Sequence, residues 1–222
     1  MLQFLVRYVL TPLVRAIYRP TVTGAENVPA EGAVIIASNH RAALDTAVIA
    51  IAAGRPVKFL GKAEYFEGKG IRGRLIAKFL DALGYIPVER GNARAGLAAL
   101  GAAHRVLNGG GAFGIYPEGT RSTDGRLHRG HTGVAALALD TRAPVVPVAV
   151  SGTEGLQPKG KRIPRLVRTS IRFGKPLDFA GWPDSSMMSR RSATDKIMYA
   201  ILELSGQEYV DTYHRRPNQD AA

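Results

Sequence analysis

His40 and Asp45 are the residues whose types and spacing most directly suggest chemistry, because they follow each other closely after an apolar run. A histidine changes its charge near neutral pH, and a carboxylate bonded to one ring nitrogen fixes the tautomer and stabilises the imidazolium. The other ring nitrogen is then free to take a proton, as a general base does. The alternative is a structural histidine with satisfied hydrogen bonds, beside an aspartate that complements a helix dipole.

The local sequence predicts that these two side chains can meet. Residues 33–37 are short, apolar and partly β-branched, which is typical of a buried strand, whereas residues 46–53 are apolar and alanine-rich, which favours a helix. On one continuous helix, positions 40 and 45 would lie about 140° apart around the axis and could not pair. We therefore expect His40 in the turn between strand and helix, and Asp45 in the first helical turn, reaching back to it.

Three other apolar runs also lead into polar or glycine residues. They are residues 85–88, followed by Glu89-Arg90; residues 111–116, followed by Pro117-Glu118-Gly119-Thr120-Arg121-Ser122; and residues 145–150, followed by Ser151-Gly152. In α/β sheets, strand ends of this kind face ligand crevices. The sequence therefore predicts one site that is assembled from several strand ends.

Together these segments resemble the glycerolipid acyltransferase family, and in particular the bacterial 1-acyl-sn-glycerol-3-phosphate acyltransferases, which make phosphatidic acid from lysophosphatidic acid. Four blocks of that family are present in its order and spacing: Asn-His-x-x-x-x-Asp at 39–45, Pro-x-x-Arg at 87–90, Pro-Glu-Gly-Thr-Arg-Ser at 117–122 and Val-Pro-Val at 146–148. The resemblance covers residues 20–152. It implies acyl transfer from acyl-CoA to the free hydroxyl of lysophosphatidic acid, with His40 as general base and Asp45 orienting it.

The composition agrees with a mechanism that has no covalent enzyme intermediate. The chain contains no cysteine, which excludes a thiol nucleophile, and no Gly-x-Ser-x-Gly segment that would supply an activated serine. Direct attack by the acceptor alcohol fits best. We expect no cofactor beyond the co-substrate acyl-CoA, and no metal ion, because the five histidines show no metal-ligand spacing with nearby carboxylates.

An acceptor phosphate needs fixed cations and backbone donors, and residues 87–122 offer both. Arg90 and Arg121 present planar guanidinium groups, and Gly119 lets backbone N–H groups approach closely. The resemblance assigns Glu118 to the same pocket, where it would accept a hydrogen bond from a glycerol hydroxyl and pair with an arginine. We include Thr120 among the residues of this pocket and expect it to shape the loop. The alternative for each arginine is a surface ion pair.

Three further positions bear on the acceptor pocket. Lys62 matches a lysine often found after the family's second strand and would add positive charge to the phosphate site, the alternative being a solvated lysine. Ala42 stands where relatives often have serine or threonine, and His131 where they often have a basic residue. We expect neither to touch the His40–Asp45 pair. We place His131 at the start of the next helix, the alternative being a second residue of the acceptor pocket.

Length and alternation of patterns predict a single α/β domain over residues 20–213. At 222 residues and 45% hydrophobic content, the chain can bury one good core. Alternating strand-like and helix-like runs predict a largely parallel or mixed central sheet flanked by helices. The expected strands are 21–23, 33–37, 56–60, 84–88, 111–116, 145–150 and 167–173, and the expected helices are 46–53, 71–83, 94–107, 132–140 and 193–204.

The two ends of the chain are predicted to lie outside this domain. Residues 1–19 are apolar but interrupted by Arg7, Pro12 and Arg15, so we expect an amphipathic helix that lies in the membrane interface and does not span the bilayer. The alternative is a helix that packs on the domain. Residues 214–222 are polar and are expected to form a flexible tail.

A formal charge of +12 indicates an anionic partner. Phospholipid headgroups, coenzyme A and lysophosphatidic acid all qualify, and so on charge alone does nucleic acid, but the chain lacks the aromatic and basic interleaving of RNA-binding strands. We therefore expect an anionic membrane surface as partner, no nucleic acid, and a peripheral or monotopic location on the cytoplasmic face of the cell membrane. One basic stretch, either membrane-facing, coenzyme-facing or merely solvated, comprises Lys159, Lys161, Arg162, Arg165 and Arg168.

Several alternatives stay open at this level. Within the enzyme class, the acceptor could instead be glycerol 3-phosphate, a lysophospholipid or a glycolipid, and acyl carrier protein could replace coenzyme A as donor. A different class altogether is a non-catalytic module that uses the same basic crevice to bind anionic lipid. Turnover that His40→Ala abolishes would distinguish the enzyme from the binding module.

Overall fold

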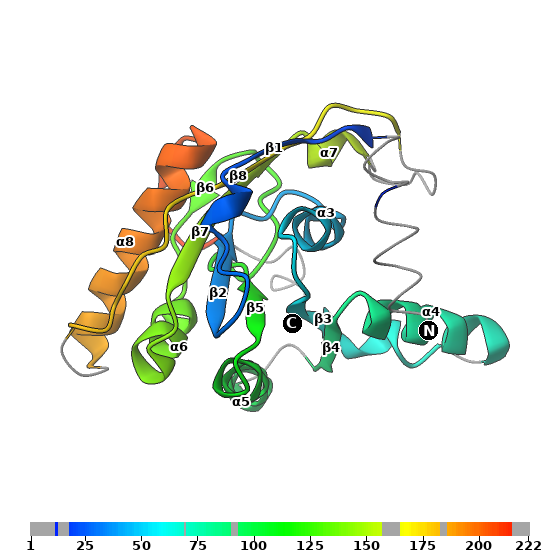
Figure 1. Cartoon of the computed structure of the whole chain (residues 1–222), viewed down its shortest axis with the longest axis horizontal. Helices are drawn as coiled ribbons and strands as arrows, with labels where there is room; N and C mark the ends of the chain where they lie inside the picture. The colour runs from blue at the N-terminus through cyan, green and yellow to red at the C-terminus, as the bar shows by residue number, and fades with distance from the viewer. Residues whose placement is uncertain are drawn as a thin grey trace.

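A mixed, seven-stranded sheet forms the centre of the part of the chain that the computed structural model describes, namely Pro12 and residues 18–68, 70–89, 93–156, 165–182 and 186–214. Its strand order is β1-β8-β7-β2-β5-β3-β4, and helices cover both of its faces (Figure 1). The predicted mixed sheet flanked by helices is thereby confirmed. No helix among the described residues is long and apolar enough to cross a bilayer.

The elements follow the expected alternation. The strands are β1 (Thr21–Thr23), β2 (Val34–Ser38), β3 (Val57–Lys62), β4 (Tyr85–Val88), β5 (Ala112–Ile115), β6 (Leu127–His128), β7 (Val145–Ser151), β8 (Ser170–Phe173) and β9 (Tyr209–Val210). The helices are η2 (Ala25–Asn27), α3 (Asp45–Ala52), η3 (Ala63–Tyr65), α4 (Gly70–Ala82), α5 (Ala93–Asn108), α6 (Gly133–Thr141), α7 (Thr153–Leu156) and α8 (Met187–Ser205).

The central strands β7, β2, β5, β3 and β4 are parallel to one another, and they carry the site. In the register of the sheet, Ile36 of β2 lies beside Gly114 of β5 on one side and Val146 of β7 on the other. Strand β8 runs antiparallel to β7, which makes the sheet mixed. Parallel strands buried on both faces appear as continuous apolar runs. The β2 and β7 sequences are of this kind, and both strands are almost wholly buried.

Alternate residues of β2 feed two hydrophobic cores, one on each face of the sheet. Ile35 packs in a core with α5, α6 and α8, whereas Ile36 packs in a core with α3. Figure 1 shows α5, α6 and α8 on one side of the sheet and α3 on the other. Gly114 in β5 has a packing reason, because a Cβ there would lie 2.1 Å from the Phe59 ring. The two cores fix the sheet, and the sheet in turn fixes where its strand ends lie.

Several predicted boundaries were wrong, and the causes are local. The last helix begins at Met187 and not at residue 193, because the Ser186 hydroxyl caps it by accepting a hydrogen bond from the Ser189 N–H. The strand expected over 167–173 is confined to Ser170–Phe173, where it pairs with β7. The short α7 helix and the β6–β9 pair were not predicted.

Some predictions fall outside the described residues. They include the interfacial helix over residues 1–19, apart from Pro12, Tyr18 and Arg19, and the tail beyond His214. The same holds for Arg90 and for Lys159, Lys161 and Arg162 of the basic stretch. These assignments stay predictions.

Candidate active site

The carboxyl ends of β2, β5 and β7 meet at one edge of the sheet, because these strands are neighbours and parallel (Figure 1). Asn39 and His40 follow β2, and the segment from Tyr116 to Ser122 follows β5. A hydrogen bond of 2.7 Å from the Ser122 N–H to the His40 carbonyl joins these two segments. The edge is therefore the kind of place where α/β proteins bind ligands.

His40 and Asp45 form the predicted pair. The His40 Nδ1 lies 2.8 Å from the Asp45 Oδ2, and Asp45 is wholly buried at the first residue of α3. The same oxygen accepts hydrogen bonds from the N–H groups of Arg41 at 2.6 Å and Ala42 at 2.8 Å. An ionised carboxylate can only accept, so Nδ1 carries the proton and Nε2 is left as the base.

The contact of Ala42 corrects one prediction. Ala42 was expected not to touch the His40–Asp45 pair, but its backbone N–H bonds the Asp45 carboxylate. The contact uses the main chain, so a residue with a hydroxyl is not needed at this position to hold the aspartate. Besides the His40 ring, the backbone N–H groups of the tight turn between β2 and α3 position Asp45, and the side chain of residue 42 is not involved.

The His40 ring is also held from its face. It stacks on Tyr116, with ring centroids 3.8 Å apart and planes inclined by 10°. The Tyr116 hydroxyl is 2.8 Å from the Thr46 hydroxyl, which keeps the tyrosine in place. Burial raises the pKa of Tyr116 well above its usual range, so the phenol stays neutral. With 18% of its side chain exposed, His40 remains accessible to a ligand.

Glu118 is buried beneath the loop that follows β5. One of its oxygens accepts from the His40 N–H at 3.2 Å, and the other accepts from the His128 N–H at 3.0 Å. Burial raises the pKa of this carboxyl to about 7, although both hydrogen bonds lower it. Glu118 thus connects the segment after β2, through His40, to strand β6, through His128. Its contact with a glycerol hydroxyl stays a prediction.

The loop after Glu118 contains the other predicted acceptor residues. Gly119 has φ 71°, and a Cβ on it would lie 3.0 Å from the His131 ring, so both conformation and space require glycine there. Thr120 is half-buried and Arg121 is exposed. Among the described residues, the Arg121 guanidinium has no ion-pair or hydrogen-bond partner, which leaves it available to an anion. His131 lies just before α6, as predicted, and its ring stacks on Tyr213.

Lys62 lies at the end of β3, in register with Val88 of β4. Its ammonium group forms an ion pair with the exposed Glu64, which offsets its charge. Because β4 ends beside β3, the segment that leads to Arg90 starts from the same edge of the sheet. The roles of Lys62 and Arg90 at a phosphate stay predictions.

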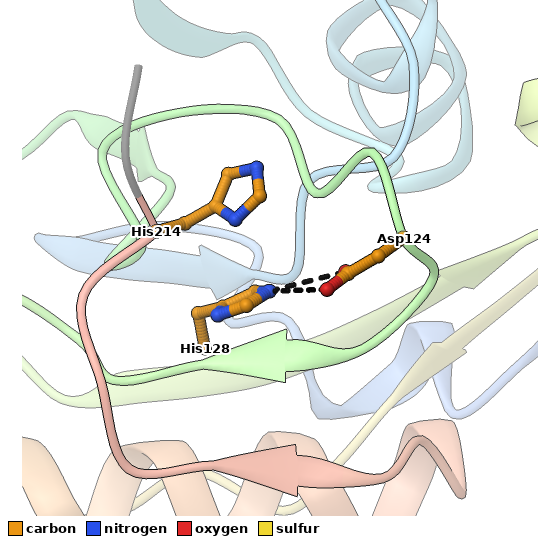
Figure 2. A group of neighbouring side chains, drawn as sticks. All are labelled: Asp124, His128 and His214. Atoms are coloured by element: carbon orange, nitrogen blue, oxygen red, sulfur yellow. Dashed lines mark hydrogen bonds and ion pairs between the residues drawn. The ribbon is translucent and has the colours of Figure 1, made fainter. Parts of the chain in front are cut away.

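We call the loop between β5 and β6, residues 116–126, the Glu118 loop. Its Asp124 lies close to His128 and His214 (Figure 2). The buried His128 places its Nε2 3.1 Å from both carboxylate oxygens of Asp124, and the centroid of the His214 ring is 4.3 Å from that of His128. Their potential ligand atoms lie within 4.8 Å of one another. The sequence spacing did not indicate this cluster, because the β6–β9 pairing brings His214 to the loop from a distant part of the chain. The prediction of no metal ion stays a prediction.

The chemistry of this cluster favours hydrogen bonding over metal binding. Burial alone would raise the pKa of Asp124, but hydrogen bonds from His128, Arg126 and Ser122 hold it well below its usual range. The His128 Nδ1 is buried without a hydrogen-bond partner among the described residues. A metal ion on Nε2 would place the proton on Nδ1, for which the described residues offer no acceptor. The contacts therefore favour the tautomer in which the Nε2–H donates to Asp124.

A family model described as Acyltransferase matches residues 19–151, which is more than half of the chain. The chain belongs to the acyltransferase family. The matched region contains His40, Asp45 and the Glu118 loop. The resemblance stated from the four sequence blocks is thereby confirmed.

Individual relatives agree with this assignment. The 1-acyl-sn-glycerol-3-phosphate acyltransferase of Bacillus subtilis is 30% identical over 193 residues, covering 84% of this chain and 88% of the relative. A chloroplastic enzyme of the same name from Brassica napus is 30% identical over 144 residues, and the chain spans only 40% of its length. The crystal structure of the lysophosphatidic acid acyltransferase PlsC from Thermotoga maritima superposes with a TM-score of 0.64 at 25% identity, covering 89% of this chain and 80% of that one.

The sequence did not indicate that Gln207 takes part in the candidate site of this acyltransferase-family member. Its side chain accepts a hydrogen bond of 2.7 Å from Asn39 and donates one of 2.6 Å to the Gly125 carbonyl. The Asn39 side chain also makes two hydrogen bonds with the main chain of Val150. Gln207 is 168 positions from Asn39, and a glutamine after the last helix gives no signal that it joins two loops.

Proposed function

We propose that this family member transfers an acyl chain from acyl-CoA to the free hydroxyl of lysophosphatidic acid, giving phosphatidic acid. The observation that carries the proposal is the bond of 2.8 Å between the His40 Nδ1 and the buried Asp45 carboxylate, which leaves a basic nitrogen on an accessible ring. The names of the relatives from Bacillus subtilis and Thermotoga maritima support the choice of acceptor.

The reaction follows from the protonation state of the pair. The His40 Nε2 takes the proton of the acceptor hydroxyl as the oxygen attacks the thioester carbonyl, and Asp45 stabilises the imidazolium that forms. The tetrahedral intermediate then collapses, the carbon–sulfur bond breaks, and the proton on Nε2 passes to the leaving thiolate. The N–H groups of Arg41 and Ala42 hold Asp45 throughout.

The acceptor phosphate would bind where the ends of β5, β3 and β4 adjoin. Arg121 is exposed there, and Arg90 and Lys62 belong to the two neighbouring strand ends. Guanidinium groups suit a phosphate because they bind two of its oxygens at once. Glu118, Gly119 and Thr120 would contribute by shaping the loop that presents Arg121.

An apolar pocket offers room for an acyl chain. It has a volume of about 470 Å³ and lies between α5, α6 and the strands β3 and β5. Its lining includes Leu60, Leu97, Phe113 and Ile115. Ile115 directly precedes Tyr116, and successive strand residues point to opposite faces, so the pocket lies behind the sheet at the same edge as His40. We assign it to the acyl chain of one substrate.

Release of coenzyme A thiol tests the proposal directly. The protein has no cysteine of its own, so a thiol-reactive dye reports only the product. We expect release from palmitoyl-CoA to require lysophosphatidic acid and to fall about 10²-fold or more in His40→Ala. His104→Ala is the matched control, because His104 also faces an aspartate, Asp140, but lies away from the site on α5.

Each other outcome points to a different function. Release without any acceptor would indicate a thioesterase, and release that persists in His40→Ala would contradict the general base. Release that needs glycerol 3-phosphate, another lysophospholipid or a glycolipid would change the acceptor, and activity only with acyl carrier protein would change the donor. Binding of anionic lipid without turnover would favour the non-catalytic module.

We also propose that the enzyme works at the cytoplasmic face of the membrane, where its lipid acceptor and its soluble donor meet.

A further inference from the structure

Helix α4 presents large apolar side chains to solvent. Ile71, Leu75, Ile76 and Phe79 are 72%, 61%, 51% and 39% exposed. At about 100° per residue these four positions fall within about 140° of the helix circumference. Figure 1 shows α4 projecting beyond the β4 edge of the sheet, away from the two cores. A soluble protein rarely exposes such a group of residues together unless the surface has a partner.

Packing within the described part of the chain does not explain these side chains. Before its last residue, Ala82, the helix turns Gly73, which is buried, and Ala77 and Leu80, which are half-buried, toward the rest of the described chain. These three follow the spacing of one helix face, and that face lies opposite to Leu75. The side of α4 that carries Gly73, Ala77 and Leu80 therefore faces the rest of the described chain, while the side with the large apolar residues remains exposed.

Exposed cations accompany the apolar side chains. Arg72, Arg74 and Lys78 are all exposed, and none of them forms an ion pair in the part of the chain that the structure describes. The helix contains no acidic residue before Asp81, although Glu67 precedes it. Long basic side chains beside apolar ones suit an interface where the apolar part is buried and the charge reaches phosphate.

We propose that the α4 face, defined by Ile71, Leu75, Ile76, Phe79 and the three cations, docks on an anionic lipid bilayer. The charges decide against two other occupants. A second copy of the chain would bring the same three cations face to face across a twofold axis. Residues 1–19 contain several arginines and no carboxylate, so they lack complementary charge as well.

The position of α4 determines which part of the protein would approach the bilayer on docking. The helix connects β3 to β4, and it begins shortly after Lys62, at the edge of the sheet that carries the candidate site. Docking through α4 would bring that edge close to the headgroup layer. The contact itself is a property of the helix and does not depend on the proposed reaction, so vesicle binding tests it separately from turnover.

A single fluorescent label tests the orientation of the docked protein. Because the chain has no cysteine, Ile76→Cys can be labelled uniquely with an environment-sensitive dye. On vesicles of phosphatidylcholine and phosphatidylglycerol we expect a blue shift and a rise in intensity. Tyr199→Cys on α8 is the matched control, because Tyr199 is 55% exposed but lies far from α4, and its label should not respond. Binding without a response at position 76 would overturn the proposal.

Charge reversal tests the electrostatic half of the contact. Each cation near an anionic surface contributes about fivefold to partitioning, so Arg72→Glu with Arg74→Glu should lower vesicle binding by about 25-fold or more. Arg105→Glu with Lys175→Glu makes the same change in net charge on other exposed surfaces and should have a much smaller effect. Arg72→Lys with Arg74→Lys should bind like the original protein, which guards against misfolding. Equal losses in the two reversed proteins would overturn the proposal, and so would a concentration-dependent dimer that the α4 reversal abolishes.

Discussion

Glu118 makes the folded protein sensitive to pH near neutrality. Its pKa is raised from 4.5 to about 7 by burial, so the folded state holds this proton at pH values where the unfolded state has released it. The free energy of unfolding should therefore decrease as pH rises between 4.5 and about 7, by roughly 3 kcal/mol in total from this group. Above that window the contribution is constant.

Glu118→Gln should remove this pH dependence. The amide cannot ionise, but its NH2 group must face one of the two N–H groups that the carboxyl now satisfies, so the variant should be less stable overall. Denaturant titrations across the window give both quantities. Glu26→Gln, at an exposed glutamate, should leave the slope unchanged. If Glu118→Gln and the original protein show the same slope, Glu118 is not the titrating group.

Among the elements, the segment after α8 holds the loop that carries the proposed acceptor-binding residues. Strand β9 pairs with β6, and Gln207 bonds both Asn39 and the Gly125 carbonyl. Gln207→Ala should reduce the free energy of unfolding by about 1–2 kcal/mol, because two hydrogen bonds are lost, one of them to the buried Asn39. It should also lower kcat more than it raises KM, since the loop bonded to His40 is loosened and the phosphate contacts are not removed.

The matched variant for this prediction is Gln207→Glu. A carboxylate can still accept from Asn39 but faces the Gly125 carbonyl without a proton to donate. Its loss of stability should therefore be at least as large as that of the alanine variant. Equal activity in all three proteins would mean that the segment has no part in positioning the site.

The pocket beside α5 makes a prediction about chain length. Gly96 lines this pocket, and nothing lies within 4 Å of where its Cβ would be, so Gly96→Leu should fold and reduce the space. We expect the preferred acyl-CoA to become shorter, measured as kcat/KM across a series of chain lengths. Gly101→Leu is the control, because Gly101 is on the same helix with open space around it but does not line the pocket. An unchanged preference would remove the pocket from the proposed function.

For the whole molecule, the charge of +12 predicts that binding of an anionic acceptor depends strongly on salt concentration. At physiological ionic strength the Debye length is about 8 Å, so interactions between exposed charges and an anionic acceptor are screened as salt rises. In micelles of uncharged detergent, we expect KM for lysophosphatidic acid to increase with sodium chloride while kcat changes little. An uncharged monoacylglycerol serves as the control acceptor. A similar loss for both acceptors would indicate that salt acts on the protein and not on recognition of phosphate.

How much of the fold and of the candidate site could be predicted from the sequence depends on how far apart along the chain the interacting residues lie. The meeting of His40 and Asp45 was predictable because the turn that joins them is local, and the strands were predictable because parallel strands buried on both faces are continuous apolar runs. Gln207 and His214 were not, because they reach the Glu118 loop only through the β6–β9 pair, whose strands are too short to leave a pattern. The helix at 71–83 was predicted, but which of its sides faces the sheet depends on neighbours that the local sequence does not show.

The flat contact between His40 and Tyr116 has a use in spectroscopy. With ring centroids 3.8 Å apart, the tyrosine ring current should move the carbon-bound proton signals of His40 upfield in a proton NMR spectrum. Of the five histidines, His128 and His214 face each other and His131 also stacks on a tyrosine, so His40→Ala is needed to assign the signal. Once assigned, that resonance reports the protonation of one ring directly, with and without bound acceptor. The ionisation of the proposed base can then be followed in the intact protein without measuring a rate.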